Sequence, residues 1–416
     1  MPGRILVDTT PLRESRDFRL LFLGQLVSML GTQLTVVAIP YQVYSMTHSS
    51  LQVGAISLAQ LFPFLAGALA AGPIGDAVDR RPIMIWTAAA GAVTSAALAV
   101  NAALAHPSLL ALYLISALAS GFYGFSSTAR SASVPGMVER RQLPAAFAMM
   151  QIEFQIGTIV GPALSGILLV IGLRLVYALD AVSFVAAVVM TVLLHPIPPA
   201  HEAGGMSMWQ STKEGLRYLR SRQALQGVYL IDINAMVFGM PRALFPAMAA
   251  TIFHGGTITL GFLYAAPGVG AFAGALTTGW VTHLRRQGWA VIIAVVLWGA
   301  AITVFGLTDT LWLSLALLAV AGWADVISAV VRNTMLQTSI PERFRSRMSS
   351  IQMAVVQGGP RLGDLESGAV ATATNVEFAV VSGGLACIVG AAVIGGLMPV
   401  FRRHVAVAGE VDDVAV

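Results

Sequence analysis

The residues best suited to chemistry in this chain of 416 residues are ionisable side chains inside long apolar stretches. Glu153 and Asp232 lie within two such stretches, and Arg361, Asp364 and Glu366 follow one another in a third. A charge at the centre of a bilayer costs about 2.5–3.5 kcal/mol, so such residues usually face a cavity and serve transport. Because desolvation disfavours the charged form of a carboxyl, the four acids are candidate proton-coupling residues. Glu153 is the first choice and Asp232 the second.

Arginines inside apolar stretches could bind a substrate. Arg242 and Arg361 are the two so placed, and the arginine side chain offers a planar fork of donors suited to carboxylate or catecholate oxygens. Gln151 and Gln357 complete the candidate substrate-binding set. Asp364 lies one helical turn beyond Arg361, so an internal ion pair that neutralises both charges is the structural alternative.

Two further carboxyls, Asp180 and Asp325, also lie in apolar stretches. We interpret Asp180 as a packing or capping residue, with a functional role as the alternative. Asp325 falls in the inner half of its stretch, where the same insertion cost marks it as a residue to follow.

Other chemistries find no support in the residues. Cys387 is the single cysteine, which excludes an internal disulfide and a cysteine metal cluster. Lys213 is the single lysine, and no phosphate-binding loop motif is present, so this chain alone cannot drive transport with ATP. The histidines fall at loop ends, and no spacing suits a metal. We therefore predict no enzyme activity, no metal and no cofactor.

The composition places these residues in a membrane. Hydrophobic residues make up 56% of the chain and charged residues only 11%, against about 25% charged in soluble domains. A spanning helix needs about 20 mostly apolar residues. Twelve stretches of the chain meet this condition: 18–45, 51–77, 82–105, 107–129, 142–171, 174–195, 223–253, 257–282, 288–308, 309–338, 346–373 and 375–400.

Basic residues predict the orientation of these spans. They gather before span 1 and after each even-numbered span, and cytoplasmic loops carry the excess of Lys and Arg. Both termini are therefore expected in the cytoplasm. The net charge of +4 then reflects topology, and nucleic-acid binding is not needed to explain it. We expect no cleaved leader, because the first apolar run is too long for a signal peptide.

The chain divides into two similar halves. The linker at 196–222 opens with prolines and ends in an amphipathic helix at 208–222, which we expect to lie on the inner leaflet. It separates a six-helix bundle at 1–195 from another at 223–400, and a tail follows at 401–416. A shift of 202 residues pairs Arg130 with Arg332, Gly161 with Gly363, and Gly166 with Gly368. Parallel repeats of this kind are typical of a major facilitator transporter.

The loop between spans 2 and 3 supports this assignment. Its sequence resembles the major facilitator signature, in which a carboxylate latches onto an arginine or a helix N-terminus and stabilises one access state. Ala77 and Asp79 depart from the usual arginine and glycine. A basic loop that only sets topology is the alternative. The resemblance implies a latch at these residues: Gly72, Asp76, Arg80 and Arg81.

Span 5 carries a second motif. Gly157, Gly161, Pro162 and Gly166 resemble the antiporter motif of drug and metabolite exporters, with Ser165 in place of a glycine. The glycines allow close helix packing and the proline bends the helix. A simple helix contact of small residues is the alternative.

Three longer stretches, 37–54, 261–279 and 334–342, look like the enterobactin exporter branch of this superfamily, and the similarity runs from about 16 to 400. The resemblance implies an all-α membrane protein whose twelve helices form two six-helix bundles around a central cavity. It further implies a monomeric, proton-driven antiporter in the cytoplasmic membrane that exports an amphipathic small molecule, with a siderophore as the expected substrate. A multidrug or antibiotic exporter, a proton-coupled importer and a membrane sensor are the alternatives.

Overall fold

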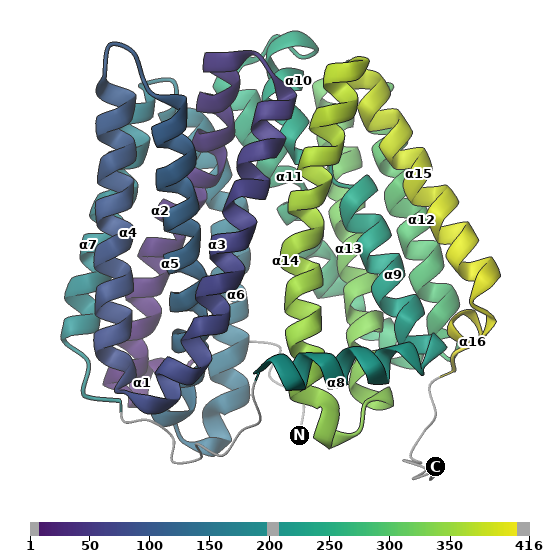
Figure 1. The fold of residues 1–416 in the computed structure, drawn as a ribbon, viewed down its shortest axis with the longest axis horizontal. Helices are drawn as coiled ribbons and strands as arrows, with labels where there is room; N and C mark the ends of the chain where they lie inside the picture. Colours follow the sequence, from purple (N-terminus) through teal and green to yellow (C-terminus); the bar gives the residue numbers. More distant parts are fainter. Residues whose placement is uncertain (1–7, 198–207, 406–416) are drawn as a thin grey trace. The chain divides into compact units, whose positions relative to one another are not determined.

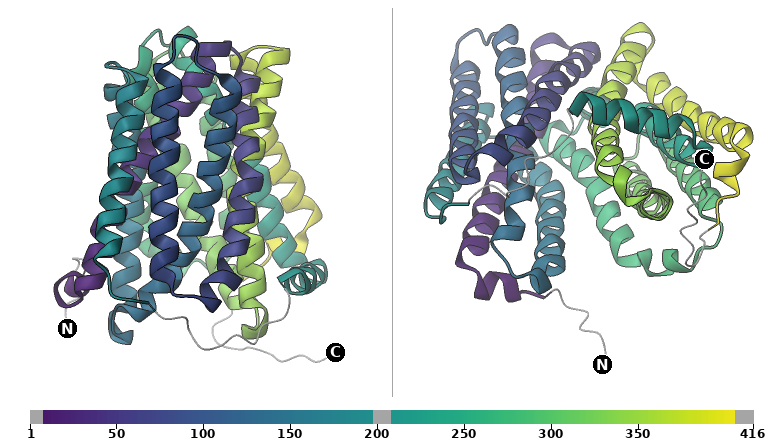
Figure 2. Two further views of the ribbon diagram at one scale, coloured as in Figure 1. Left: turned by 60° about the vertical axis from the view of Figure 1, so that its left-hand side comes forward. Right: turned by 60° about the horizontal axis from the view of Figure 1, so that its bottom comes forward.

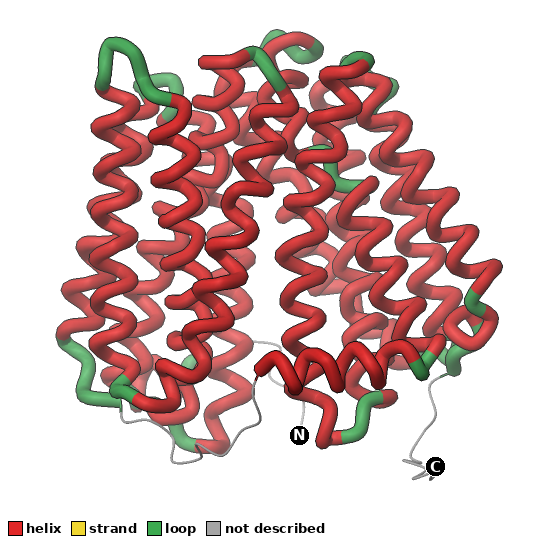
Figure 3. Tube along the Cα trace, viewed as in Figure 1, coloured by secondary structure: helices red, strands yellow, loops and turns green. Residues whose placement is uncertain are grey.

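The computed structural model describes residues 8–197 and 208–405, and these residues are almost wholly helical (Figure 3). In these two ranges the only β-bridge pairs Arg286 with Val405. The predicted all-α class is confirmed.

Each predicted span corresponds to helical structure close to its expected limits. The first half contains α2 (Arg16–Thr47), α3 (Ser50–Ala77), α4 (Arg80–Ala103), α5 (Leu109–Ser133), α6 (Leu143–Leu168) and α7 (Leu173–Val192). The second half contains α9 (Gln223–Phe238), α10 (Phe245–Thr251), α11 (Gly256–Thr277), α12 (Gln287–Phe305), α13 (Leu311–Ser339), α14 (Glu342–Ala373) and α15 (Val376–Leu397). Short helices are α1 (Thr10–Glu14), α8 (Met208–Arg220) and α16 (Pro399–Arg402), with 3-10 turns η1 (Val134–Gly136), η2 (Arg140–Gln142), η3 (Arg242–Leu244) and η4 (Thr278–His283).

Eleven stretches of the described chain are helical, long and apolar enough to cross a membrane. The remaining long helix, α14, has 32 residues and carries Arg361, Asp364 and Glu366. Its length suits a span, while its charges lower its hydropathy, as expected for a helix that lines a polar path.

Local sequence explains where several spans begin. Ser15, Ser49 and Ser108 precede α2, α3 and α5, and each serine side chain accepts a hydrogen bond from a backbone N–H of the first helical turn. These N-caps satisfy donors that the helix itself cannot pair. These three helices therefore begin directly after a serine N-cap, which is visible in the sequence.

Span 7 is interrupted. The sequence predicted one continuous stretch at 223–253, and this prediction is wrong in the middle of the stretch. Helix α9 ends at Phe238, and the chain resumes as η3 and α10. Gly239 and Pro241 weaken the helix here, since glycine is flexible and proline lacks an N–H donor. The buried Trp298 indole donates a 2.8 Å hydrogen bond to the Gly239 carbonyl, which compensates for a lost helical bond.

The chain forms two compact units. The first comprises the described residues within Met1–Gly205 together with Arg242–Gly268 and Ser367–Val376; the second comprises those within Met206–Pro241, Val269–Glu366 and Glu377–Val416. In the first unit α3 packs on α5, and α7 packs on α2 and α4. These helices run side by side (Figure 2). In the second unit α12 packs on α13. The predicted bundle limits, 1–195 and 223–400, remain a prediction.

The amphipathic helix predicted at 208–222 is present as α8, which crosses the lower ends of α9 and α13 in Figure 1. The Tyr218 ring stacks on Phe344 with 4.3 Å between ring centroids, and its hydroxyl donates to the Ser339 carbonyl at 3.4 Å. These contacts hold α8 against the ends of α13 and α14. Its placement on the inner leaflet remains a prediction.

Candidate functional site

Glu153 lies on the buried face of α6. Its side chain is only 4% exposed, and the neighbouring turns of this face carry Met149, Gly157 and Gly161. A Cβ atom on Gly157 would come within 2.7 Å of Met29, and one on Gly161 within 2.3 Å of Gln33. Helix α6 therefore packs closely on α2, and Glu153 lies on the same buried face one turn before this contact.

Arg130, in the last turn of α5, supplies a positive charge that acts on the Glu153 carboxyl. Its guanidinium does not bond this carboxyl; it donates a 2.5 Å hydrogen bond to the Gln25 side-chain oxygen on α2. Within the described residues no hydrogen bond or salt bridge to the Glu153 carboxyl is present. A buried acid thus lies in the field of a cation without being tied to it. Sequence spacing gives no sign of this pairing, because Arg130 is 23 residues from Glu153.

A second arginine site lies in the other compact unit. Arg332 on α13 forms a salt bridge with Asp232 on α9, and both side chains are almost fully buried. The Asp325 carboxylate lies 3.8 Å from the same guanidinium. Here the structure brings together residues that the sequence analysis selected separately. Asp232, a candidate proton carrier, is held by a cation.

The two sites occupy equivalent places in the repeat. Helices α5 and α13 begin at Leu109 and Leu311, 202 residues apart, as Arg130 and Arg332 are. Each arginine contacts the first membrane helix of its half, α2 or α9. The residue 202 positions after Glu153 is Val355, so the second half has no counterpart of that acid.

Asp180 ties three helices of the first unit together. Its carboxylate accepts hydrogen bonds from the hydroxyls of Thr35 on α2, at 2.8 Å, and Ser95 on α4, at 2.7 Å. The side chain is 2% exposed. These bonds support the structural interpretation made from the sequence.

The candidate substrate residues lie on three elements. On α14, Arg361 donates to the Gln357 carbonyl at 3.1 Å, Asp364 is buried, and Glu366 is half-buried. Gln151 on α6 is exposed. Arg242 lies in η3, at the interruption of span 7.

The Arg242 carbonyl accepts a 3.1 Å hydrogen bond from the Tyr264 hydroxyl. Arg242 belongs to the first compact unit and Arg361 to the second.

The latch loop is described in part. Gly72 and Asp76 belong to the last turns of α3, and the Asp76 side chain lies outside the described structure. Arg80 donates to the Ala132 carbonyl at 2.7 Å and Arg81 to the Val192 carbonyl at 2.6 Å, at the C-terminal ends of α5 and α7. Arginines are suited to such helix C-termini.

Asp79 has a clear structural role. Its carboxylate accepts from the backbone N–H groups of Arg81, at 2.8 Å, and Ile197, at 3.0 Å. This departure from the family pattern thus caps α4 and anchors the chain that leaves α7.

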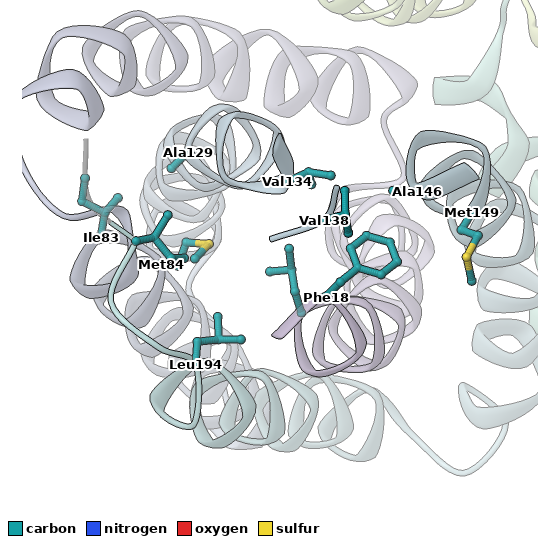
Figure 4. Packing of buried hydrophobic residues seen from close by; sticks show 11 residues of the cluster. Phe18, Ile83, Met84, Ala129, Val134, Val138, Ala146, Met149 and Leu194 are labelled. Carbon is teal, nitrogen blue, oxygen red and sulfur yellow. The ribbon is translucent and has the colours of Figure 1, made fainter. Parts of the chain in front are cut away.

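An apolar cluster includes side chains from the start of α4, directly after this loop (Figure 4). It gathers buried side chains from the starts of α2, α4 and α6 and the ends of α5 and α7: Phe18, Leu21, Ile83, Met84, Ala129, Val134, Val138, Ala146, Met149, Leu194 and Ile197. The cluster joins the helix ends of the first unit at which Arg80, Arg81 and Arg130 lie.

The antiporter motif is a packing surface on two sides of α6. Gly157 and Gly161 face α2, and the Ser165 hydroxyl donates to the Leu34 carbonyl at 2.8 Å. A Cβ atom on Gly166 would lie 2.7 Å from the Thr257 carbonyl oxygen, at the start of α11. Pro162 lies inside the helix and is buried.

The fold and these repeat-related arginine sites define a transporter of the major facilitator superfamily. The chain belongs to the transmembrane secretion effector family of this superfamily, whose family model matches residues 8–405. It is therefore a multi-pass membrane transporter of small molecules and not an enzyme.

Curated relatives cover most of the chain. It is 31% identical over 380 residues to the enterobactin exporter EntS of Citrobacter koseri, covering 91% of each chain. It is 30% identical over 401 residues to the enterobactin exporter EntS of Escherichia coli strain K12, covering 96% of this chain and 95% of the relative.

Solved structures agree on the fold. A mutant of the nucleoside transporter NupG matches with a TM-score of 0.78 at 14% identity, over 92% of this chain and 100% of that one. A bacterial homologue of the human lysosomal transporter Spinster matches with a TM-score of 0.72 at 15% identity, over 95% and 99%.

Proposed function

We propose that this transporter is an exporter that exchanges protons for an acidic, amphipathic small molecule, with a siderophore as its substrate. The observation that carries the proton coupling is Glu153. It is a buried carboxyl on the helix of the antiporter motif, under the field of Arg130 but bonded to neither Arg130 nor any other described residue. Such a carboxyl can gain and lose a proton without breaking a salt bridge.

Transport then proceeds by alternating access in the cytoplasmic membrane, driven by the proton gradient without a cofactor. One proton moving down 100 mV supplies about 2.3 kcal/mol, so one or two protons per cycle suffice. We further propose that the protein works as a monomer with both termini in the cytoplasm. The names of its curated relatives support the siderophore assignment.

The coupling proposal is tested in proteoliposomes with an imposed pH gradient. Glu153→Gln should abolish proton-driven export, because the amide cannot carry a proton, while downhill movement of substrate continues. Glu139→Gln, a neutralised carboxyl on an exposed loop, is the matched control and should transport normally. If pH-driven export persists in Glu153→Gln, in Asp232→Asn and in the double variant, the coupling site is elsewhere.

The substrate proposal rests on the charge of Arg361. Its guanidinium donates to the Gln357 carbonyl of its own helix, and its planar fork of donors suits an acidic ligand. Asp364, one turn further along α14, would hold this group between transport cycles, so substrate and Asp364 would compete for it.

Arg361→Met should sharply reduce export of an acidic siderophore while a neutral dye is still expelled, with membrane levels of the protein unchanged. Equal loss of both activities would make Arg361 structural, and no loss of either would remove it from the site. If the unaltered protein exports the dye but not the siderophore, the multidrug alternative is favoured instead.

A further inference from the structure

Several arginines cluster at one end of the second compact unit, although they come from segments that are far apart in the sequence. Arg222 precedes α9, Arg285 and Arg286 precede α12, and Arg402 and Arg403 end α16. We call these five residues the arginine face. Arg217 and Arg220 on α8 flank it, and both are exposed.

Specific contacts bring these segments together. The Phe401 side chain is fully buried, and a Cβ atom on Gly227 of α9 would lie 2.3 Å from its ring. The Val400 N–H donates to the Gln223 side chain at 3.0 Å, and Arg286 pairs with Val405 in the β-bridge. Helix α16 is therefore fixed against the starts of α9 and α12 (Figure 1).

The arginines are available to a ligand. Within the described residues, no salt bridge joins any of them to an acid. Arg222, Arg285, Arg286 and Arg403 are exposed and Arg402 is half-buried. Burial lowers the pKa of His404, which disfavours its charged form, so the charge of the face comes mainly from its arginines. Unpaired like charges held this close favour an anionic partner.

Apolar and aromatic surface adjoins the charges. Leu397 is 73% exposed and Val400 is 58% exposed, immediately before Arg402 and Arg403. Trp289 is partly exposed, and the Arg402 guanidinium lies 5.7 Å from its ring centroid. Tryptophan at this level of a membrane helix is typical of the interface between headgroups and acyl chains. The face thus presents donors for a phosphate beside a surface for hydrocarbon.

From this juxtaposition we infer that the arginine face binds the phosphate of an anionic phospholipid, whose acyl chains lie along Leu397 and Val400. A topogenic role for basic loops requires charge on this side of the membrane, but it does not require segments around 222, 286 and 402 to converge. Bound lipid would fasten α8 and α16 to the membrane surface beside the ends of α9 and α12. This inference does not depend on the transported substrate.

The test follows thermal unfolding of the purified full-length protein in detergent during titration with dioleoyl phosphatidylglycerol or dioleoyl phosphatidylcholine. Phosphatidylglycerol should raise the unfolding temperature at lower concentration than phosphatidylcholine. The triple variant Arg286→Gln, Arg402→Gln, Arg403→Gln should need about tenfold more phosphatidylglycerol or more, because each arginine near an anionic surface contributes severalfold. Arg13→Gln, Arg19→Gln, Arg140→Gln removes three exposed arginines from the first unit and should respond like the unaltered protein.

Two further measurements test whether the arginine face binds an anionic lipid. Brominated phosphatidylglycerol should quench Trp289 fluorescence, read as the difference between the unaltered protein and Trp289→Phe, more than brominated phosphatidylcholine does. Inorganic phosphate alone should give no thermal shift. Equal effects of the two lipids, an unchanged triple variant, or a full shift with inorganic phosphate would each overturn the lipid site.

Discussion

The two repeat-related arginines show how one architecture supports two electrostatic arrangements. Arg332 is locked to Asp232 in a buried salt bridge, with Asp325 close by. Arg130 occupies the same place in the first half, but bonds the neutral Gln25 and leaves Glu153 without a direct partner. The second half has a paired charge, and the first half has a buried acid that no described residue bonds directly.

Because one acid is bonded to an arginine and the other is not, we expect the two sites to have different roles. A buried pair resists protonation, because adding a proton to its acid would leave an uncompensated arginine. An acid that only feels the arginine field can take up a proton at lower cost. We therefore interpret the Arg332 site as a structural clamp and the Arg130 site as the centre of coupling.

The largest expected effect comes from breaking the clamp. Asp232→Asn leaves the Arg332 guanidinium buried with only Asp325 nearby, and we expect a loss of about 3 kcal/mol in the free energy of unfolding. Thermal unfolding in detergent measures it. The double variant Asp232→Leu, Arg332→Met removes both charges and should recover most of the stability; an unaltered single variant would mean that the pair does not act as a clamp.

A smaller effect is expected from making the first site resemble the second. Gln25→Glu offers Arg130 a bonded carboxylate, which reduces its field at Glu153 and should weaken proton-driven export about fivefold or more, a normal size for coupling between sites. Gln25→Met removes the amide without adding charge and serves as the control. Undiminished coupling in Gln25→Glu, with the protein folded, would show that the Arg130 field does not matter.

The smallest effect on affinity is expected in the latch loops, where the halves also differ. The first loop has Asp76 where the second has His283. Asp76→Asn should slow turnover, since it weakens one access state, while the equilibrium affinity for substrate changes little. His283→Asn should leave both unchanged. A large loss of affinity with normal turnover in Asp76→Asn would contradict the latch.

Packing of the motif helices follows the repeat more faithfully than the charges do. Gly157 and Gly161 of α6 face Met29 and Gln33 of α2, and Gly359 and Gly363 of α14 face Met236 and Val237 of α9. All four glycines leave no room for a side chain. Close helix contact is thus shared by both halves, and the electrostatics diverged around it.

The sequence by itself determined the membrane class, the spans, α8 and the repeat. Apolar runs of this length must lie in a bilayer. It also selected Glu153 and Asp232, because charges in apolar runs are costly and therefore noticeable.

Only the tertiary structure decided which charges meet. Arg130 is 23 residues from Glu153, and Arg332 is 100 residues from Asp232, separations at which helix periodicity carries no information. The interruption of span 7 also depends on tertiary contact, because the buried Trp298 stabilises the open turn at Gly239. Spans follow from local hydropathy, whereas ion pairs and helix breaks depend on what packs against them.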